Sequence, residues 1–134
     1  RFGSVHRNTY VNAPAQLRST LEVRARPGLY VTGQLAGVEG YVESAALGLL
    51  TGIHVAARAQ GRVSAPPPPE TAHAALLRHL SEADPRHFQP MNVNFGLFPP
   101  LPRTGRKIRK REKQEQFAAR AHAALEPWAA EVSP

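Results

Sequence analysis

The chain has 134 residues, which is enough to bury one modest hydrophobic core and is the size of a single domain. It contains no cysteine, which excludes disulfide bonds and thiolate zinc sites. Because no apolar run reaches the roughly 18 residues of a membrane helix and no signal-peptide core is present, a cytoplasmic location without membrane contact is predicted. The formal net charge is +7, but residues 103–113 hold seven Lys or Arg against one Glu, so most of the excess lies in one segment.

The N-terminal part of the chain predicts two short strands. Residues 8–11 and residues 17–23 combine apolar and β-branched positions in the pattern of strands. An imidazole, a fixed cation and an amide stand in consecutive positions near the start, at His6, Arg7 and Asn8. From residue types alone, this group is most simply a polar loop.

A glycine-rich loop follows the next apolar run. Residues 28–34 predict a buried strand, and the loop after it is punctuated by Gly33, Gly37 and Gly40. A strand, a loop and a helix in this order direct free backbone N–H groups and the positive end of the helix dipole toward a ligand. Glycine spacing of this kind is a weak signal, however, and an ordinary strand–helix turn explains it about as well.

A helix is predicted from Tyr41, with Gly61 as its C-terminal cap. Its expected buried stripe repeats at steps of three and four residues and comprises Val42, Ala45, Ala46, Leu49, Leu50, Ile53 and Ala57. Gly48 and Gly52 lie one turn apart in the same helix. Because each glycine costs about 1 kcal/mol relative to alanine inside a helix, close packing is expected at these positions.

A rigid proline spacer at residues 66–69 precedes a second helix, which is predicted to begin at Glu70. Its expected buried side comprises Leu76, Leu77 and Leu80. His73 and His79 are six residues apart, which is neither of the spacings that place two ligands on one helix face, so no metal pair is expected.

Residues 88–102 are apolar and rich in proline, so they are expected to pack across the domain or to line a pocket. Asn92 and Asn94 carry amides that suit the edge of a heterocycle. A last helix is predicted at residues 109–126, with Pro127 ending it.

The basic segment has two interpretations. A solvated start of the last helix explains it as well as contact with a polyanion does. No aromatic residue interrupts the segment, so base stacking is not expected there. Its cations are Arg103, Arg106, Lys107, Arg109, Lys110, Arg111 and Lys113.

Three stretches of the chain carry a resemblance to a known family. Residues 33–52 read G-Q-x-x-G-x-E-G-Y-x-E-S-A-x-x-G-L-x-x-G, and residues 88–101 read F-Q-P-M-N-x-N-F-G-L-x-P-P-L. Residues 1–14 read R-x-G-x-x-H-R-N-T-x-x-N-x-P. The first stretch is similar to the second flavin-contacting segment of glutathione-reductase-type FAD proteins, and all three resemble the folate- and FAD-dependent tRNA uracil-5-methyltransferases.

The resemblance implies an α/β fold, namely the C-terminal part of a glutathione-reductase-type, Rossmann-like FAD-binding domain followed by C-terminal helices. Residues 1–61 would form the C-terminal half of that domain. Residues 62–102 would be a spacer, a helix and a pocket-lining loop packed on it, and residues 103–134 the basic segment and last helix. The G-x-G-x-x-G motif that holds a dinucleotide pyrophosphate is absent, so a missing N-terminal part of the same protein is expected.

The activity implied by the resemblance is the methylation of carbon 5 of the T-loop uridine in tRNA. The one-carbon donor is 5,10-methylenetetrahydrofolate, reduced FAD supplies reducing equivalents, and NADH or NADPH regenerates the flavin. Family members use cysteine thiolates on the nucleobase. This chain has none, so no catalytic residue is assigned to it and it is expected to be inactive alone. No metal is expected.

The resemblance also implies three groups of binding residues. The flavin-contacting group is Gly33, Gln34, Gly37, Val38, Glu39, Gly40, Tyr41 and Val42. The folate or substrate group, expected to converge from distant positions, is His6, Arg7, Asn8, Asn92 and Asn94. The seven cations of the basic segment would contact tRNA phosphates without reading sequence.

Two alternatives stay open on sequence. The related FAD-dependent protein that modifies the tRNA wobble uridine shares much of the glycine motif, but it has T-T-G-Y where residues 38–41 here read V-E-G-Y. A non-catalytic, basic RNA-binding module belongs to a different class. It would leave the glycine spacing and residues 88–102 unexplained.

Overall fold

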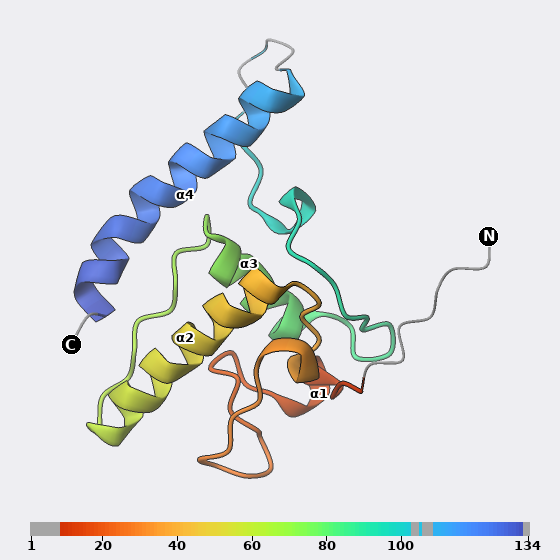
Figure 1. Ribbon diagram of the computed structural model, residues 1–134, viewed down its shortest axis with the longest axis vertical. Coiled ribbons are helices and arrows are strands. Elements are labelled where there is room, and N and C mark those ends of the chain that lie inside the picture. Colours follow the sequence, from red (N-terminus) through yellow and green to blue (C-terminus); the bar gives the residue numbers. More distant parts are fainter. Residues whose placement is uncertain (1–8, 103–104, 106–108, 133–134) are drawn as a thin grey trace.

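The computed structural model describes residues 9–102, 105 and 109–132. Within these residues the elements are, in order, α1 (Ala13–Gln16), the 3₁₀ helix η1 (Gly33–Ala36), α2 (Tyr41–Ala59), α3 (Ala72–Glu82), the 3₁₀ helix η2 (Phe95–Leu97) and α4 (Lys110–Val132) (Figure 1). α3 packs against α1 and α2, while α4 lies along the outside of the molecule. Among the helices described, none is long and apolar enough to cross a membrane.

The predicted strands are not formed in the described part of the chain, where β pairing is limited to isolated bridges. Residues 17–23 fold back on themselves, because Leu17 pairs with Val23 and Leu21 has a φ of 65°. Glu22 then bridges to Tyr30, inside the stretch predicted as the strand before the glycine loop. Pairing this short does not make a sheet, since two strands without further partners are marginal in water. The described fold is therefore mainly helical, which corrects the predicted sheet.

A buried carboxylate joins this folded-back segment to α2. Glu22 is 7% exposed, accepts a hydrogen bond from Gly28 N at 2.8 Å and pairs with Arg58 of α2. Arg18 Nε lies 3.7 Å from the same carboxylate. Burying a carboxylate is costly unless it is paired and hydrogen-bonded, so these contacts compensate its burial.

α2 begins and ends where the sequence predicts. It starts at Tyr41 after an extended Gly40, and Gly61 ends it with a φ of 68°. The amide of Gly61 donates to Arg58 O and that of Arg62 to Ala57 O, which are the two hydrogen bonds of a Schellman motif. The buried side differs from the predicted stripe, however. It comprises Leu47, Leu50, Thr51, His54 and Ala57, whereas Val42 and Leu49 are exposed.

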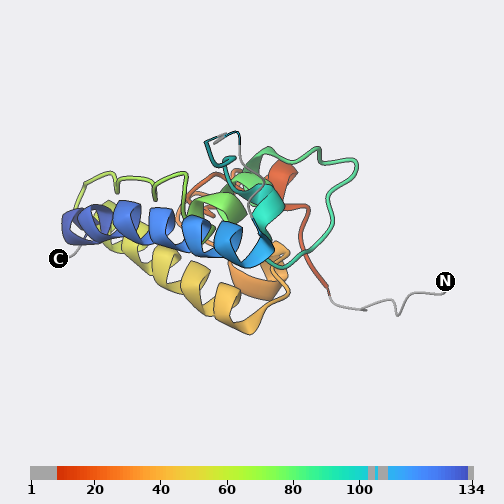
Figure 2. The same ribbon diagram turned by 90° about the horizontal axis from the view of Figure 1, so that it is seen from above.

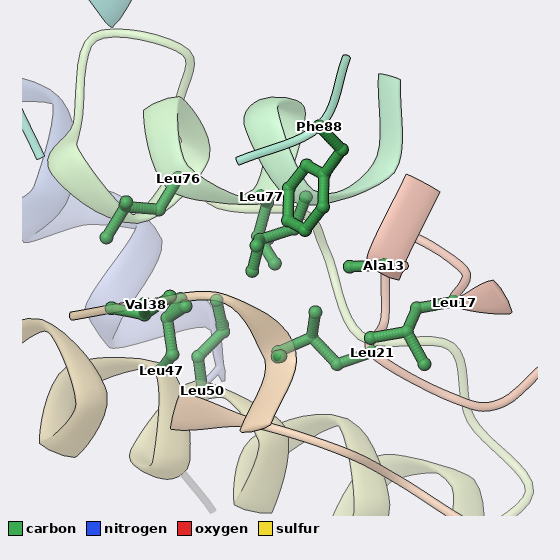
Figure 3. Packing of buried hydrophobic residues seen from close by; sticks show 11 residues of the cluster. Ala13, Leu17, Leu21, Val38, Leu47, Leu50, Leu76, Leu77 and Phe88 are labelled. Atoms are coloured by element: carbon green, nitrogen blue, oxygen red, sulfur yellow. The ribbon is translucent and has the colours of Figure 1, made fainter. Parts of the chain in front are cut away.

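The hydrophobic core lies between α1, α2 and α3. α3 begins two residues later than predicted, because Thr71 caps it by accepting a hydrogen bond from Ala74 N at 3.2 Å. Its predicted buried leucines are confirmed as buried. Figure 3 shows Leu76 and Leu77 of α3 facing Leu47 and Leu50 of α2.

α4 continues to Val132, so the prediction that Pro127 ends the helix is wrong. A proline inside a helix removes one backbone hydrogen bond. Here the next residue anchors the last turns, because Trp128 Nε1 donates to Ala65 O at 3.1 Å and its ring packs against the core. Nearer the N-terminal end of α4, Phe117 is buried at 3% exposure.

Candidate functional site

The glycine loop is a tight turn that two left-handed residues make possible. Gly33 has a φ of 64° and opens η1, and Gly37 has a φ of 101° and closes it. Gly37 N donates to Gln34 O at 3.0 Å, and Val38 N donates to Gly33 O at 3.2 Å. The chain thereby reverses within a few residues and enters α2 through Gly40.

Residues 88–91 pack against this loop and form backbone hydrogen bonds with it. A Cβ at Gly37 would lie 2.6 Å from Phe88 Cζ, so the ring fills the space under the turn. Met91 N donates to Gly37 O at 3.1 Å, and Glu39 N donates to Met91 O at 3.3 Å. These two bonds form a parallel bridge between Val38 and Met91. The fold thus joins two stretches that carry separate sequence motifs.

The predicted flavin-contacting residues divide into a buried and an exposed set. Gly33, Gly37 and Val38 are buried, and their backbone groups are used inside the chain. The exposed set comprises Gln34, Glu39, Tyr41 and Val42, with Gly40 partly exposed between them. Tyr41 and Val42 are 95% and 80% exposed, which is unusual for an aromatic and a β-branched residue side by side.

The N-terminal end of α2 already carries a negative charge of its own. A Cβ added at Gly40 would overlap the Glu43 carboxylate, so this side chain folds back over the start of the helix. An acid in the first turn is favourable because the helix dipole is positive there. Ser44 Oγ donates to Val38 O at 3.4 Å, and Thr32 Oγ1 is buried without a hydrogen-bond partner in the described residues. An anionic ligand at this helix end would therefore lie beside Glu43.

The predicted folate group is only partly within the described residues. His6, Arg7 and Asn8 lie outside them, so their convergence with the other two is a prediction only. Asn92 and Asn94 are exposed and lie directly after the bridge to the glycine loop. Asn94 Oδ1 caps η2 by accepting from Gly96 N at 3.0 Å, so Asn94 also has a structural role.

The described part of the basic segment lies at the start of α4. Arg109, Lys110, Arg111 and Lys113 are exposed there, whereas Arg103, Arg106 and Lys107 lie outside the described residues. Arg111 Nε lies 2.9 Å from Glu115 Oε1 in an i, i+4 pair. Cations in the first turn of a helix face the positive end of its dipole, so their interaction with the dipole does not stabilise the helix.

An aromatic cluster holds residues 95–100 on α4, and the sequence analysis missed it. The rings of Phe95 and Phe98 lie 5.1 and 5.7 Å from the ring of Phe117. The guanidinium of Arg120 lies 5.2 Å from the same ring and donates to the carbonyls of Pro99 and Pro100. The signal was present in the apolar composition of residues 88–102, but it did not indicate which element they would cover.

A comparison with protein families finds a match to the part of the chain that contains the glycine loop. A family model described as Glucose inhibited division protein A matches residues 1–63, which include the whole glycine loop and α2. The match extends over the stretch that most resembles FAD proteins in sequence.

Relatives that match the whole chain define the family more narrowly. The chain is 53% identical to the methylenetetrahydrofolate--tRNA-(uracil-5-)-methyltransferase TrmFO of Desulforudis audaxviator, over 98% of this chain and 30% of the relative. Identity to the proteins of the same name from Syntrophus aciditrophicus and Pelobacter propionicus is 47% and 53%, over 99% and 100% of this chain and 30% and 29% of the relatives. The chain is therefore similar along essentially its whole length to proteins of this name, and it spans about 30% of the length of these curated relatives.

Proposed function

We propose that this chain is the part of a folate- and FAD-dependent tRNA (uracil-5-)-methyltransferase that supports one side of the flavin. The observation that carries the proposal is the identity of about half of all positions, over essentially the whole chain, to relatives whose name states this reaction. The V-E-G-Y reading of residues 38–41 supports this reaction over wobble-uridine modification. A non-catalytic RNA-binding module is not supported by relatives of this kind.

We infer that the exposed set of the glycine loop faces the flavin. Gln34 and Glu39 offer an exposed amide and carboxylate, and Tyr41 offers an exposed aromatic ring. Gly33, Gly37 and Val38 then act by shaping the turn and not by direct contact. The unpaired Thr32 Oγ1 and the crowded space at Gly40 are consistent with a loop shaped to lie against another group.

Bound FAD would supply the redox chemistry, and this chain would position it. Glu43 lies beside the helix end, so it would disfavour additional negative charge there, opposing the helix dipole. Asn92 and Asn94 are placed next to the loop through Met91, which is consistent with a folate ring held near the flavin. His6, Arg7 and Asn8 would complete this folate group.

The remaining functions are assigned to the rest of the full-length protein. A cysteine nucleophile and a pyrophosphate-binding motif are not in this sequence. We therefore propose that both come from the part of the family's length that the chain does not span. A cytoplasmic location is proposed as well, because the substrate of such an enzyme is tRNA.

The test uses the full-length protein. Purified protein should transfer a one-carbon unit from 5,10-methylenetetrahydrofolate to carbon 5 of the T-loop uridine, in a reaction that needs FAD and NADH or NADPH. Nucleoside analysis of the tRNA identifies the position of the product. Modification of the wobble uridine in place of the T-loop uridine would contradict the proposal and support the wobble-uridine alternative.

Placement of the flavin at the loop is tested by Gly40→Val in the same protein. The backbone at Gly40 has a φ of −78° that any residue can adopt, and the nearest described atoms to an added Cβ all belong to the flexible end of Glu43. The variant should therefore fold but lose most of its FAD, as measured by the flavin absorbance per protein. Retention of a full flavin spectrum would place the cofactor elsewhere.

A further inference from the structure

Residues 89–97 carry the two asparagines of the proposed folate group and are called here the asparagine segment. In this segment, all of which the structure describes, the short helix η2 is the only regular element, so contacts with other elements hold most of its backbone. Figure 2 shows the segment leading from the C-terminal end of α3 toward the N-terminal half of α4. Asn92 and Asn94 have short, exposed side chains, so the backbone of the segment decides where their amides lie.

Two neighbouring residues of α3 bind the two ends of the asparagine segment. At its start, Nε2 of His79 lies 3.0 Å from Gln89 O. A carbonyl oxygen only accepts hydrogen bonds, so Nε2 of His79 carries the hydrogen in this contact. At the other end, Nη2 of Arg78 donates to Leu97 O at 2.7 Å. Two consecutive side chains of one helix thus hold both ends of the same segment.

α3 is a firm support for these two side chains. Leu76, Leu77 and Leu80 bury one side of the helix in the core, and Thr71 caps its N-terminal end. Groups carried by a well-packed helix are held more precisely than groups carried by a loop. The hydrogen bonds from α3 therefore fix both ends of the asparagine segment relative to the core.

The asparagine segment is also bound to the glycine loop, close to the contact with His79. Met91 N donates to Gly37 O, and Glu39 N donates to Met91 O. The ring of His79 lies 5.2 Å from the ring of Phe88, measured between centroids, and Phe88 fills the space next to Gly37. His79 therefore contacts the segment through its ring nitrogen and the residue that packs under the glycine loop through its ring.

We propose that Arg78 and His79 are positioning residues, which set the place of Asn92 and Asn94 relative to the glycine loop. The inference rests on the proposed function, because it takes the two asparagines as contacts of the folate. Arg78 and His79 touch neither the folate nor the flavin, and each acts through a backbone carbonyl of the asparagine segment. Transfer between two bound rings requires close and correctly oriented contact, so a small displacement of the segment weakens it.

Two substitutions of His79 in the full-length, FAD-loaded protein separate its hydrogen bond from its ring. His79→Phe keeps a ring against Phe88 but removes the donor, whereas His79→Gln keeps an N–H donor near the place of Nε2 and removes the ring. Calorimetric titration with tetrahydrofolate measures the Kd. We expect His79→Phe to raise this Kd by about 3- to 10-fold, which is the effect of one hydrogen bond, and His79→Gln to stay near the wild type. An unchanged Kd in His79→Phe, or an equal rise in both variants, would overturn the proposal.

Arg78→Met tests the other end of the asparagine segment. Methionine keeps an unbranched side chain but removes the donor to Leu97 O, so the Kd for tetrahydrofolate should rise by a similar factor. Arg86→Met is the matched control, because it removes the same charge near the end of α3 from a side chain that is 82% exposed and paired with Asp84. Equal effects of the two variants would assign the change to charge and would overturn the proposal.

Hydrogen exchange without folate provides a readout that does not depend on the reaction. In His79→Phe and Arg78→Met, the amides of Met91 and Gly96 should exchange faster than in the wild type, while the flavin absorbance per protein stays the same. Faster exchange or a lower melting temperature with an unchanged Kd for tetrahydrofolate would show a merely structural role and overturn the inference. A wild-type protein that transfers no one-carbon unit to tRNA would instead contradict the proposed function, so the two failures are distinguishable.

Discussion

A φ of 101° at Gly37, with the Phe88 ring 2.6 Å from where its Cβ would lie, leaves room only for glycine at this position. Gly37→Ala in the full-length protein should therefore lower the free energy of unfolding through two effects. The left-handed backbone costs a non-glycine residue about 1–2 kcal/mol, and overpacking against a buried ring costs about 1–3 kcal/mol. Denaturant unfolding measures the total.

Gly28 provides the matched control for that change. It also has a left-handed backbone, with a φ of 88°, but no described atom lies within 4 Å of the Cβ position. Gly28→Ala should thus show the backbone effect without the overpacking. If the two variants lose the same stability, Phe88 does not support the loop as tightly as the structure indicates.

The buried imidazole of His54 should make stability depend on pH. Burial lowers the pKa of His54 below its ordinary value of 6.5, because the charged form loses hydration. The unfolded chain then binds a proton more readily than the folded chain does. The contribution of His54 to stability is full above pH 6.5 and is lost as the pH falls through the lowered pKa of the folded state.

His54→Leu removes this titrating group and should weaken the loss of stability on acidification. Melting temperatures of the full-length protein, measured from about pH 7.5 to about pH 5.5, span the relevant window. Some pH dependence should persist, because burial also lowers the pKa of His73. Parallel curves for the wild type and the variant would show that His54 is not the source.

At the scale of single elements, the long helices were largely predictable from sequence, whereas the short helix α1 and the strands were not. α2 was predicted from its start at Tyr41 to its cap at Gly61, because periodicity and capping are local signals. Its buried side was predicted less well, since an apolar face that is exposed in this chain looks the same in sequence as one that is buried. The strand at residues 28–34 failed because a strand needs partners, which local sequence does not reveal.

Phe117 holds the N-terminal half of α4 against residues 95–98. Phe117 is 3% exposed and contacts the rings of Phe95 and Phe98, which fix residues 95–100 on the helix. Phe117→Ala should remove about 3–5 kcal/mol of packing energy and release the N-terminal half of α4. The released helix, rich in arginine and lysine, should then be cut faster by trypsin in the full-length protein.

Phe117→Leu is the control for this prediction, because leucine keeps an apolar side chain at the same position. Cleavage should therefore increase in the order wild type, Phe117→Leu, Phe117→Ala. If Phe117→Ala is as resistant as the wild type, the anchor of α4 lies elsewhere, for example at the hydrogen bond between Trp128 and Ala65 O.

At the scale of the whole molecule, the sequence predicted the components of the site better than their arrangement. The glycine loop and residues 88–101 were each recognised as motifs, yet neither indicated that Phe88 and Met91 would support the loop directly. Such contacts join positions about fifty residues apart, and hydrophobic periodicity carries no information over that distance.

The cations of the basic segment lie at the start of α4, where they oppose the dipole of this helix. Such an arrangement is expected if the segment binds phosphates of tRNA and does not serve to stabilise α4. In the full-length protein, Arg109→Gln with Lys110→Gln should weaken tRNA binding about equally for cognate and altered T-loops. The slope of log affinity against log salt should fall by about 0.7–0.9 for each phosphate contact removed.

Arg24→Gln with Arg26→Gln removes the same charge from an exposed turn at the opposite end of the molecule from the start of α4 (Figure 1). A general effect of net charge would change the salt slope equally in both double variants, whereas local contacts would change it only at α4. A salt titration of the wild type and the two variants separates these cases. An unchanged slope for the α4 variant would assign these cations a solvated, structural role, because counterion release accompanies every phosphate contact that a cation makes.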